Sequence, residues 1–244
     1  EAVLTGDEFV INGQKTWTTL AQDATHMFCL ARTSKEGKPQ SGISFFLIDL
    51  DQPGVTIRPI KNLAGDEEFC EVFLDNVRVP ADCLVGEINE GWGIAKALLS
   101  FERIFIGSPK QSQYAVKRLE LIASETNLFE NAVFRDKLTR LKLNVFDLES
   151  TYQSFAEIVK RGQTLGPDVS LLKIWGTETF ARLSELMVEV AGPQGAIIGK
   201  IPFQDSEVDV MSQFYAARPA TIYGGSNEIQ RNIIAKGVLK LPSK

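Results

Sequence analysis

The feature that most constrains the fold is a change of hydrophobic periodicity close to residue 88. Before it, short alternating runs rich in β-branched and aromatic residues predict strands at residues 8–12, 26–31, 43–49, 55–59 and 70–79. Turn signals such as Asn12-Gly13 and Pro53-Gly54 separate these runs. This regular spacing predicts an antiparallel β-sandwich or barrel domain over residues 1–88.

Beyond residue 88 the period becomes helical. Five stretches are predicted as helices, at residues 91–125, 131–161, 168–191, 205–217 and 226–239. Pro109 predicts a kink or a break near residues 107–109, and Asp168 is a candidate N-cap of the third helix. Long helices with short connections predict an antiparallel, four-helix-bundle-like domain over residues 89–244, so the fold class is α+β.

Composition excludes several classes of function. The 244 residues carry a net charge of −5 with no block of Lys or Arg, which disfavours nucleic-acid binding. No apolar run approaches the ~18 residues of a membrane span, and the first residues lack the layout of a signal peptide. Three cysteines are expected as buried thiols of a reducing compartment such as the cytoplasm. With one histidine, no histidine-rich metal site is expected, and His26 is predicted as a half-buried strand residue.

The stretch from Gly91 to Gly107 carries the strongest catalytic candidate. On a helical wheel, Glu102 lies between two apolar rows, and Lys96, Ser100 and Arg103 lie opposite. The two rows are formed by Ile94, Leu98, Phe101 and Phe105, and by Ala95, Leu99 and Ile106. Desolvation raises the pKa of a carboxylate, which suits a general base. The alternatives are a structural ion pair or a helix rolled so that Glu102 meets solvent.

Two further stretches could bind a ligand. Trp17 offers a flat apolar face beside the hydroxyls of Thr18 and Thr19, although a tryptophan in the β core is the alternative. In residues 223–231, two glycines precede a helix whose first N–H groups could accept an anion or a carbonyl oxygen. Ser226 is the predicted N-cap of that helix.

Taken in order, the motifs INGQKTWTT, GISFFLIDLDQPGV, EVFLDNVRVPADCLVGEINEGW, FER, VAGPQG and IYGGSNEIQR resemble the acyl-CoA dehydrogenase family over essentially the whole chain. The resemblance implies the middle β domain and the C-terminal helical domain of that fold. It also implies FAD as cofactor, α,β-dehydrogenation of an acyl-CoA thioester, and an electron-transfer flavoprotein as electron acceptor. Homotetramers or heterotetramers are expected, in the bacterial cytoplasm or in a mitochondrial matrix. Family members carry an additional N-terminal helical domain, so the chain resembles a fragment.

The resemblance also implies roles for individual residues. The cofactor-binding residues would be Trp17, Thr18, Thr19, Ser226, Asn227 and Glu228, together with Glu189 and Gly192, which would meet the FAD of a neighbouring subunit. Glu189 replaces the glutamine that family members commonly carry at its position, so its contact with a neighbouring subunit's FAD is a departure from the family pattern.

The resemblance implies the catalytic base through the residues at positions 224 and 102, taken together. Many family members carry a glutamate where this chain has Gly224, whereas other branches carry it on the first bundle helix, directly before an arginine. Glu102-Arg103 matches that second pattern. Glu102 is therefore the expected base, Arg103, Gly224 and Gly225 are expected beside the substrate, and the Gly224 N–H is expected to polarise the thioester carbonyl.

One departure from the family favours a rival interpretation. The Arg-x-x-Phe-Gly pattern that usually touches the FAD pyrophosphate is missing. A non-catalytic partner subunit of a heteromeric enzyme is therefore one alternative, and an acyl-CoA oxidase or flavin monooxygenase is another. The sequences of the motifs most resemble those of bacterial members that act in sterol-side-chain, dicarboxylate or aromatic-acid degradation. Fatty acids are the family's general substrate class.

Overall fold

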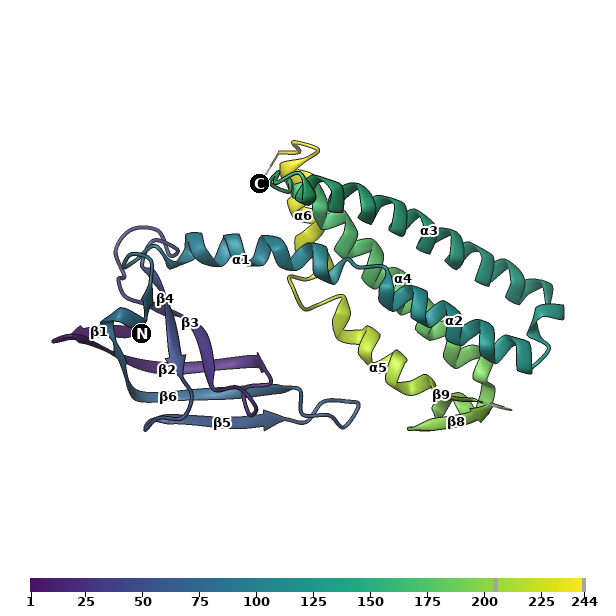
Figure 1. Ribbon diagram of the computed structural model, residues 1–244, viewed down its shortest axis with the longest axis horizontal. Helices are drawn as coiled ribbons and strands as arrows, with labels where there is room; N and C mark the ends of the chain where they lie inside the picture. The colour runs from purple at the N-terminus through teal and green to yellow at the C-terminus, as the bar shows by residue number, and fades with distance from the viewer. Residues whose placement is uncertain (204–205, 243–244) are drawn as a thin grey trace. The chain divides into compact units, whose positions relative to one another are not determined.

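The computed structural model describes residues 1–203 and 206–242; within these ranges, the side chains of residues 100–103 and 206 are not described. The chain divides into two compact units, Glu1–Leu98 and Leu99–Lys244. Figure 1 shows strands in the first unit and mostly helices in the second. The predicted domain boundary after residue 88 stays a prediction.

The first unit is an antiparallel β-sandwich. One sheet has the order β1 (Ala2–Thr5), β2 (Glu8–Thr19), β6 (Phe69–Pro80), β5 (Val55–Ile60). The other has the order β3 (His26–Arg32), β4 (Ile43–Asp49), β7 (Leu84–Val85), and a short 3-10 turn, η1 (Ala81–Cys83), precedes β7. The sheets are separate, so the barrel alternative is wrong. Alternate residues face inward, and Phe46, Ile48, Val72 and Val77 are fully buried between the two layers.

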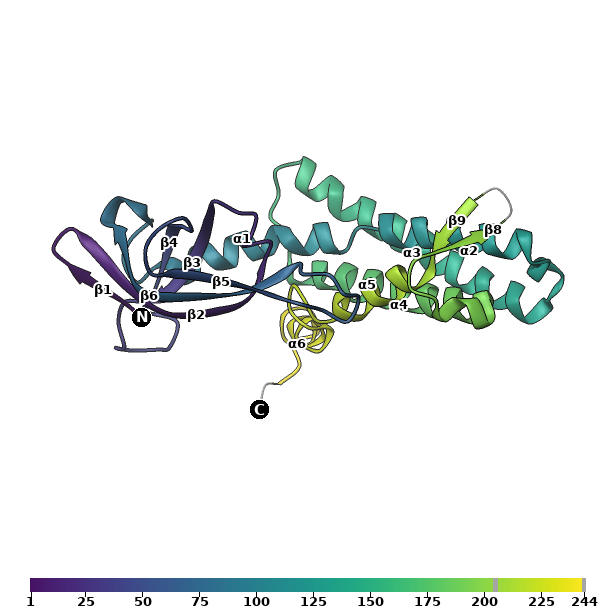
Figure 2. The same cartoon turned by 90° about the horizontal axis from the view of Figure 1, so that it is seen from below.

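The second unit is built around one central helix. α4 (Ser170–Ala191) packs against α2 (Lys110–Glu125), α3 (Ala132–Lys160), α5 (Val210–Ala220) and α6 (Asn227–Gly237). Figure 2 shows α3 and α4 running side by side in this unit. The main core includes Leu119, Leu183 and Met187, none of which is exposed. α1 (Gly91–Ile106) precedes α2, and the boundary between the two units falls inside it.

The predicted break in the first long helical stretch is confirmed, because α1 ends at Ile106 and α2 begins at Lys110. Short 3-10 turns, η2 (Leu128–Glu130), η3 (Pro167–Val169) and η4 (Gly192–Ala196), lie between the helices. The prediction that Asp168 caps α4 is wrong. Pro167 starts a 3-10 turn that contains Asp168 and runs into α4 without a side-chain cap.

The predicted helix over residues 205–217 begins too early. β8 (Lys200–Phe203) and β9 (Ser206–Asp209) pair as a hairpin, and α5 begins only at Val210. The Asp209 carboxylate accepts a hydrogen bond from the Ser212 N–H at 2.9 Å, so it caps α5 where the strand ends. The buried side chains of Ile201, Phe203 and Val208 explain the hairpin, because they pack into the main helical core.

The prediction that His26 is half-buried is wrong as well. Met27 and Cys29 face the sandwich core, so the alternation of β3 turns His26 outward, where it is exposed. Its ring Nδ1 lies 3.0 Å from the Thr25 hydroxyl.

The cysteines are all unpaired. Cys29 and Cys70 are buried and Cys83 is half-buried, and burial raises the pKa of the Cys29 thiol. No helix in the described ranges combines the length and the apolar character needed to cross a bilayer. The described residues also contain no cluster of His, Cys, Asp and Glu that could hold a metal ion.

Candidate functional site

Trp17 lies at an irregularity of β2. The pairing with β6 shifts register between Lys15 and Thr18, and Trp17 in this bulge has a left-handed φ of 65°. Its side chain is 65% exposed, so the alternative of a core tryptophan is wrong. The ring contacts Phe69 edge-on, with 6.0 Å between the ring centroids. A left-handed non-glycine residue costs about 1–3 kcal/mol, and such strain concentrates at functional sites.

Thr18 and Thr19 follow the bulge at the end of β2. They pair with Cys70 and Phe69 of β6; Thr18 is half-buried and Thr19 is exposed. Leu20, the next residue, again has a left-handed φ, of 51°. The strand thus ends with an exposed indole and two hydroxyls on consecutive residues. This is an arrangement that an aromatic ligand with a polar edge can use.

The second predicted stretch forms a tight turn before α6. Gly224 and Gly225 have φ of 64° and 82°, which only glycine adopts without strain. Ser226 caps α6 as predicted, with its hydroxyl accepting from the Ile229 N–H at 3.4 Å. The Glu228 carboxylate accepts hydrogen bonds from its own N–H and from the Ser226 hydroxyl, which lowers the pKa of Glu228.

The predicted base, Glu102, and its neighbour Arg103 have side chains that lie outside the described residues. In an α-helix, position 102 lies one turn before Ile106 on the same face. A Cβ added to Gly224 would clash with the Ile106 Cδ1, so the Ile106 side chain packs against the Gly-Gly turn.

The two predicted apolar rows of α1 are only partly buried. Ala95 is buried, and Ile94 and Ile106 are half-buried. By contrast, Leu98 and Leu99 are 46% and 45% exposed, and Phe105 is 79% exposed. The chain therefore leaves a strip of apolar surface on the helix that carries position 102.

A buried polar network missed by the sequence analysis ties α6 to α4. The fully buried Lys173 ammonium donates to the Asn227 Oδ1 at 2.8 Å. The Asn227 amide donates to the Thr177 hydroxyl at 3.1 Å and to the Glu178 carboxylate at 3.3 Å. Burial lowers the pKa of Lys173 to about 8, while the carboxylates of Glu228 and Glu178 oppose that shift. The side chain of Asn227 is thus used inside the domain. No local pattern in the sequence reveals this network, because Lys173 and Asn227 lie 54 residues apart.

Glu189 and Gly192 lie at the end of α4. The Lys137 ammonium of α3 donates to both oxygens of the Glu189 carboxylate, at 2.6 and 2.9 Å. Glu189 also lines an open cleft of about 390 Å³ between α3 and α4. Gly192 ends α4 with a left-handed φ of 59°. Their predicted contact with a neighbouring subunit's cofactor stays a prediction.

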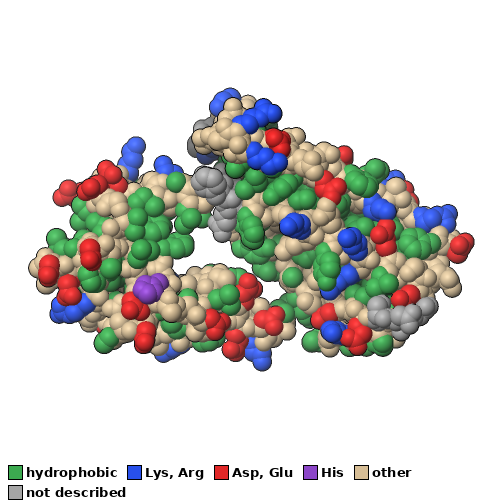
Figure 3. Space-filling model, in the orientation of Figure 1, with side chains coloured by type: hydrophobic (Ala, Val, Ile, Leu, Met, Phe, Trp, Pro, Cys, Tyr) green, Lys and Arg blue, Asp and Glu red, His purple; other side chains and the backbone are tan. Residues whose placement is uncertain are grey.

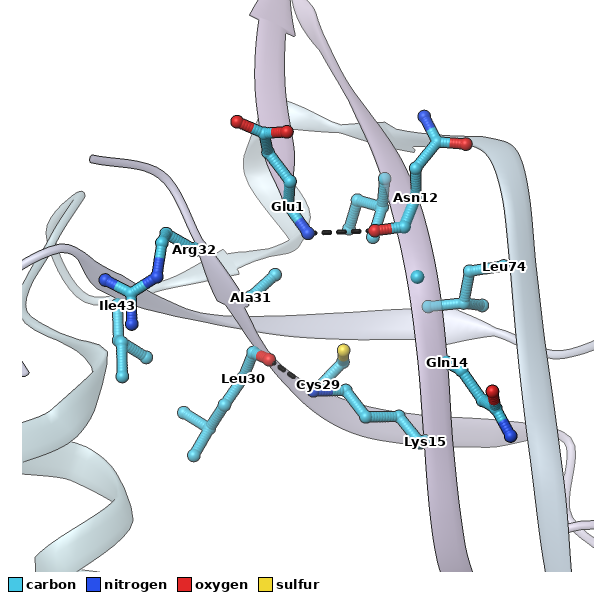
Figure 4. Close-up of a pocket in the computed structure, with 12 residues that line it drawn as sticks. Glu1, Asn12, Gln14, Lys15, Cys29, Leu30, Ala31, Arg32, Ile43 and Leu74 are labelled. Carbon is cyan, nitrogen blue, oxygen red and sulfur yellow. Dashed lines mark hydrogen bonds between the residues drawn. The ribbon is translucent and has the colours of Figure 1, made fainter. Parts of the chain in front are cut away.

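A separate cavity of about 240 Å³ lies in the β unit, lined mainly by β2 and β3 (Figure 4). The Lys15 ammonium donates to the Leu30 carbonyl there at 2.6 Å. None of the predicted site residues lines it. On the face seen in Figure 3, Lys and Arg side chains lie among Asp and Glu side chains over the helical unit.

The described residues fit a flavin in two respects. The Trp17 face and the Thr19 hydroxyl are open to a planar ring with polar edges. At the α6 end, no described residue accepts a hydrogen bond from the N–H of Gly225 or Ser226, and these donors suit the oxygens of a cofactor or of a substrate.

Comparison with known proteins gives consistent matches. The family model for the acyl-CoA dehydrogenase middle domain matches residues 1–77, and the one for the acyl-CoA dehydrogenase C-terminal domain matches residues 89–239. Acyl-CoA dehydrogenase IpdE1 of Mycobacterium tuberculosis is 40% identical over 247 residues, which cover 99% of this chain and 62% of the relative.

Solved structures agree. The Tcur3481-Tcur3483 steroid ACAD superposes with a TM-score of 0.91 at 27% identity, over 100% of this chain and 63% of that chain. The ChsE4-ChsE5 complex from Mycobacterium tuberculosis gives a TM-score of 0.88 at 28% identity, over 100% of this chain and 64% of that chain. The chain spans about six tenths of the length of these relatives.

Proposed function

Because the chain belongs to the acyl-CoA dehydrogenase family, we propose that it serves the FAD-dependent α,β-dehydrogenation of an acyl-CoA thioester, with Glu102 as the base. The observation that carries the assignment of the base is the packing of α1 in the helical unit. Ile106 contacts Gly224, and position 102 shares its helix face one turn earlier. A carboxylate at 102 is then near the turn expected to bind the thioester carbonyl.

Cofactor binding is assigned to three segments of the chain. Trp17, Thr18 and Thr19 would hold the ring system, and Ser226 and Glu228 would bind at the start of α6. Glu189 and Gly192 would meet the cofactor of a neighbouring subunit, and Asn227 would act by fixing α6 to α4. When bound, FAD supplies the acceptor for the hydride that leaves the β carbon.

The remaining chemistry belongs to the chain's own residues. The Glu102 carboxylate removes the α proton, and the N–H groups of the Gly-Gly turn stabilise the negative charge that develops on the thioester oxygen. The exposed apolar side chains of Leu98, Leu99 and Phe105 give an acyl chain a surface to cover. Covering them would exclude water from this part of α1. Arg103 and Gly225 would lie beside the substrate.

The wider setting follows from the family. An electron-transfer flavoprotein would reoxidise the enzyme, and the protein would form homotetramers or heterotetramers. The Tcur3481-Tcur3483 neighbour is named a steroid ACAD, which supports a sterol-side-chain or related acyl-CoA as substrate. Three cysteines without a disulfide agree with the expected cytoplasmic location.

The test is Glu102→Gln in the full-length protein. The amide keeps the size of the side chain but cannot take a proton, so the variant should retain its flavin and lose flavin bleaching by acyl-CoA thioesters, with at least a thousandfold drop in rate. Glu120→Gln, which removes a carboxylate paired with Lys142 on the surface, is the control and should bleach normally. Normal bleaching by Glu102→Gln would reject the assignment of the base.

A second candidate function is a non-catalytic subunit that supports the cofactor of an active partner. The observation in its favour is that two structural neighbours are pairs of different chains, Tcur3481-Tcur3483 and ChsE4-ChsE5. The same preparation separates the candidates. A full-length protein that is yellow when purified alone supports the catalytic function, whereas a colourless protein supports the partner subunit.

A further inference from the structure

Gln230 is the most buried polar side chain next to the Gly-Gly turn. It lies on the first turns of α6, is 2% exposed, and its own N–H donates to the Ser226 carbonyl at 2.9 Å. Its side-chain Nε2 donates to the carbonyls of Gly224 and Gly225, at 3.0 and 3.3 Å. Because both carbonyl oxygens can only accept, the amide must present its nitrogen to them.

These two hydrogen bonds fix the direction of two peptide N–H groups. The structure has no cis peptide bond in its described part, so each N–H points opposite to the carbonyl of its own peptide unit. With the carbonyls of Gly224 and Gly225 turned toward Gln230, the N–H groups of Gly225 and Ser226 are turned away from it. Within the described residues, neither of these N–H groups has an acceptor.

The turn is closely packed by two side chains. A Cβ on Gly225 would lie 2.8 Å from the Gln230 Nε2, and one on Gly224 would clash with the Ile106 Cδ1. The Asn227 N–H donates to the Thr221 carbonyl at 2.9 Å, which closes the loop that contains both glycines. Ile106 thus packs against the turn, and Gln230 both packs against it and is hydrogen-bonded to its carbonyls.

Gln230 is poorly explained as a packing residue. Its Oε1 is buried and has no hydrogen-bond partner among the described residues, which is unfavourable for stability. An apolar side chain of similar size would fill the same space without an unsatisfied acceptor. The function left to the amide is the one its nitrogen performs on the two carbonyls.

We propose that Gln230 is a positioning residue, which aims the N–H groups of Gly225 and Ser226 at an acceptor oxygen of the bound substrate or cofactor. This inference rests on the proposed function, in which the turn meets the acyl-CoA thioester and FAD. The loss of Gln230 should have a different effect if the oxygen belongs to the substrate than if it belongs to the cofactor. A thioester oxygen requires aligned donors mainly during the reaction, whereas a cofactor oxygen requires them for binding.

The experiment compares three variants of the full-length protein. Gln230→Met removes the donor at similar size, and Gln230→Glu keeps the shape but places a carboxylate before the two carbonyls. Leu119→Ala is the stability control, because Leu119 is fully buried in the main helical core and lies on α2. The measurements are hydrogen–deuterium exchange of peptides covering residues 221–231, the dissociation constant of FAD, and kcat and KM with an acyl-CoA thioester.

Both Gln230 variants should exchange faster at residues 221–231 than Leu119→Ala does. If the acceptor is the thioester oxygen, kcat should fall about ten- to a hundredfold with KM and FAD affinity little changed, since misplaced donors mainly raise the barrier. If the acceptor belongs to the cofactor, FAD should bind at least tenfold more weakly.

Exchange at the turn equal to that of the control overturns the inference. The inference is also overturned if kcat and FAD affinity fall no further in the Gln230 variants than in Leu119→Ala. If the unsubstituted protein neither binds FAD nor turns over any acyl-CoA, the proposed function fails together with the catalytic part of this inference. The exchange data then still decide whether Gln230 holds the turn.

Discussion

At the scale of single residues, Trp17 shows what a sequence can and cannot reveal. The stretch Trp17-Thr18-Thr19 could be singled out from the sequence, because it places an indole and two hydroxyls on consecutive residues. Its exposure could not be predicted, since it depends on a register shift against β6, a strand 50 residues away in the sequence. A bulge leaves no local pattern when the bulged residue is not glycine.

The left-handed φ of Trp17 predicts an inverted order of stability between two variants. Alanine is normally more stable than glycine in a strand, but at φ 65° glycine avoids the steric penalty. The unfolding free energy of Trp17→Gly, measured by urea unfolding, should therefore be higher than that of Trp17→Ala by about 1 kcal/mol. Both variants should lose flavin affinity, because both lack the ring.

Thr16, the preceding exposed residue, gives the matched control for that order. It lacks a positive φ, so Thr16→Gly should be less stable than Thr16→Ala. If Trp17→Ala proved the more stable variant at position 17 as well, the left-handed conformation would be contradicted.

At the scale of elements, local signals predicted more than long-range ones. α6 and its Ser226 cap could be predicted because cap and helix lie within a few residues of each other. The hydrogen bond between Lys173 and Asn227 joins residues 54 apart, and no spacing rule connects them. The β8–β9 hairpin was missed for a related reason, because its four-residue strands are too short to show a clear alternation.

The buried lysine predicts a pH dependence of stability. Below about pH 8, Lys173 is protonated in both the folded and the unfolded chain, so its burial cost is fully present. As pH rises from about 8 toward 10.5, the folded chain releases the proton while the unfolded chain keeps it, which favours the folded state. The unfolding free energy should rise relative to Lys173→Met over this range, by up to on the order of 3 kcal/mol.

Urea unfolding of both proteins between pH 7 and 10 measures this difference. The other charged groups around the site, Glu178, Glu228 and Arg231, are common to both proteins and therefore cancel. Parallel pH profiles for the two proteins would show that Lys173 does not titrate in the folded chain at these pH values.

At the scale of the whole molecule, the change of periodicity near residue 88 predicted an α+β chain, and the order of the motifs predicted its family. Both follow from patterns that extend over many residues. The relation of Glu102 to the Gly-Gly turn, by contrast, requires two segments more than 100 residues apart to meet through Ile106 and Gly224.

The exchange of the substrate's α proton with solvent tests this relation most directly. An acyl-CoA whose β position cannot give up a hydride is incubated in D₂O with the full-length protein, and its mass is followed. With Glu102 as the base, the unsubstituted protein should incorporate deuterium at the α carbon, and Glu102→Gln should not do so above the rate without protein. Equal incorporation by the two proteins would contradict Glu102 as the group that takes the proton.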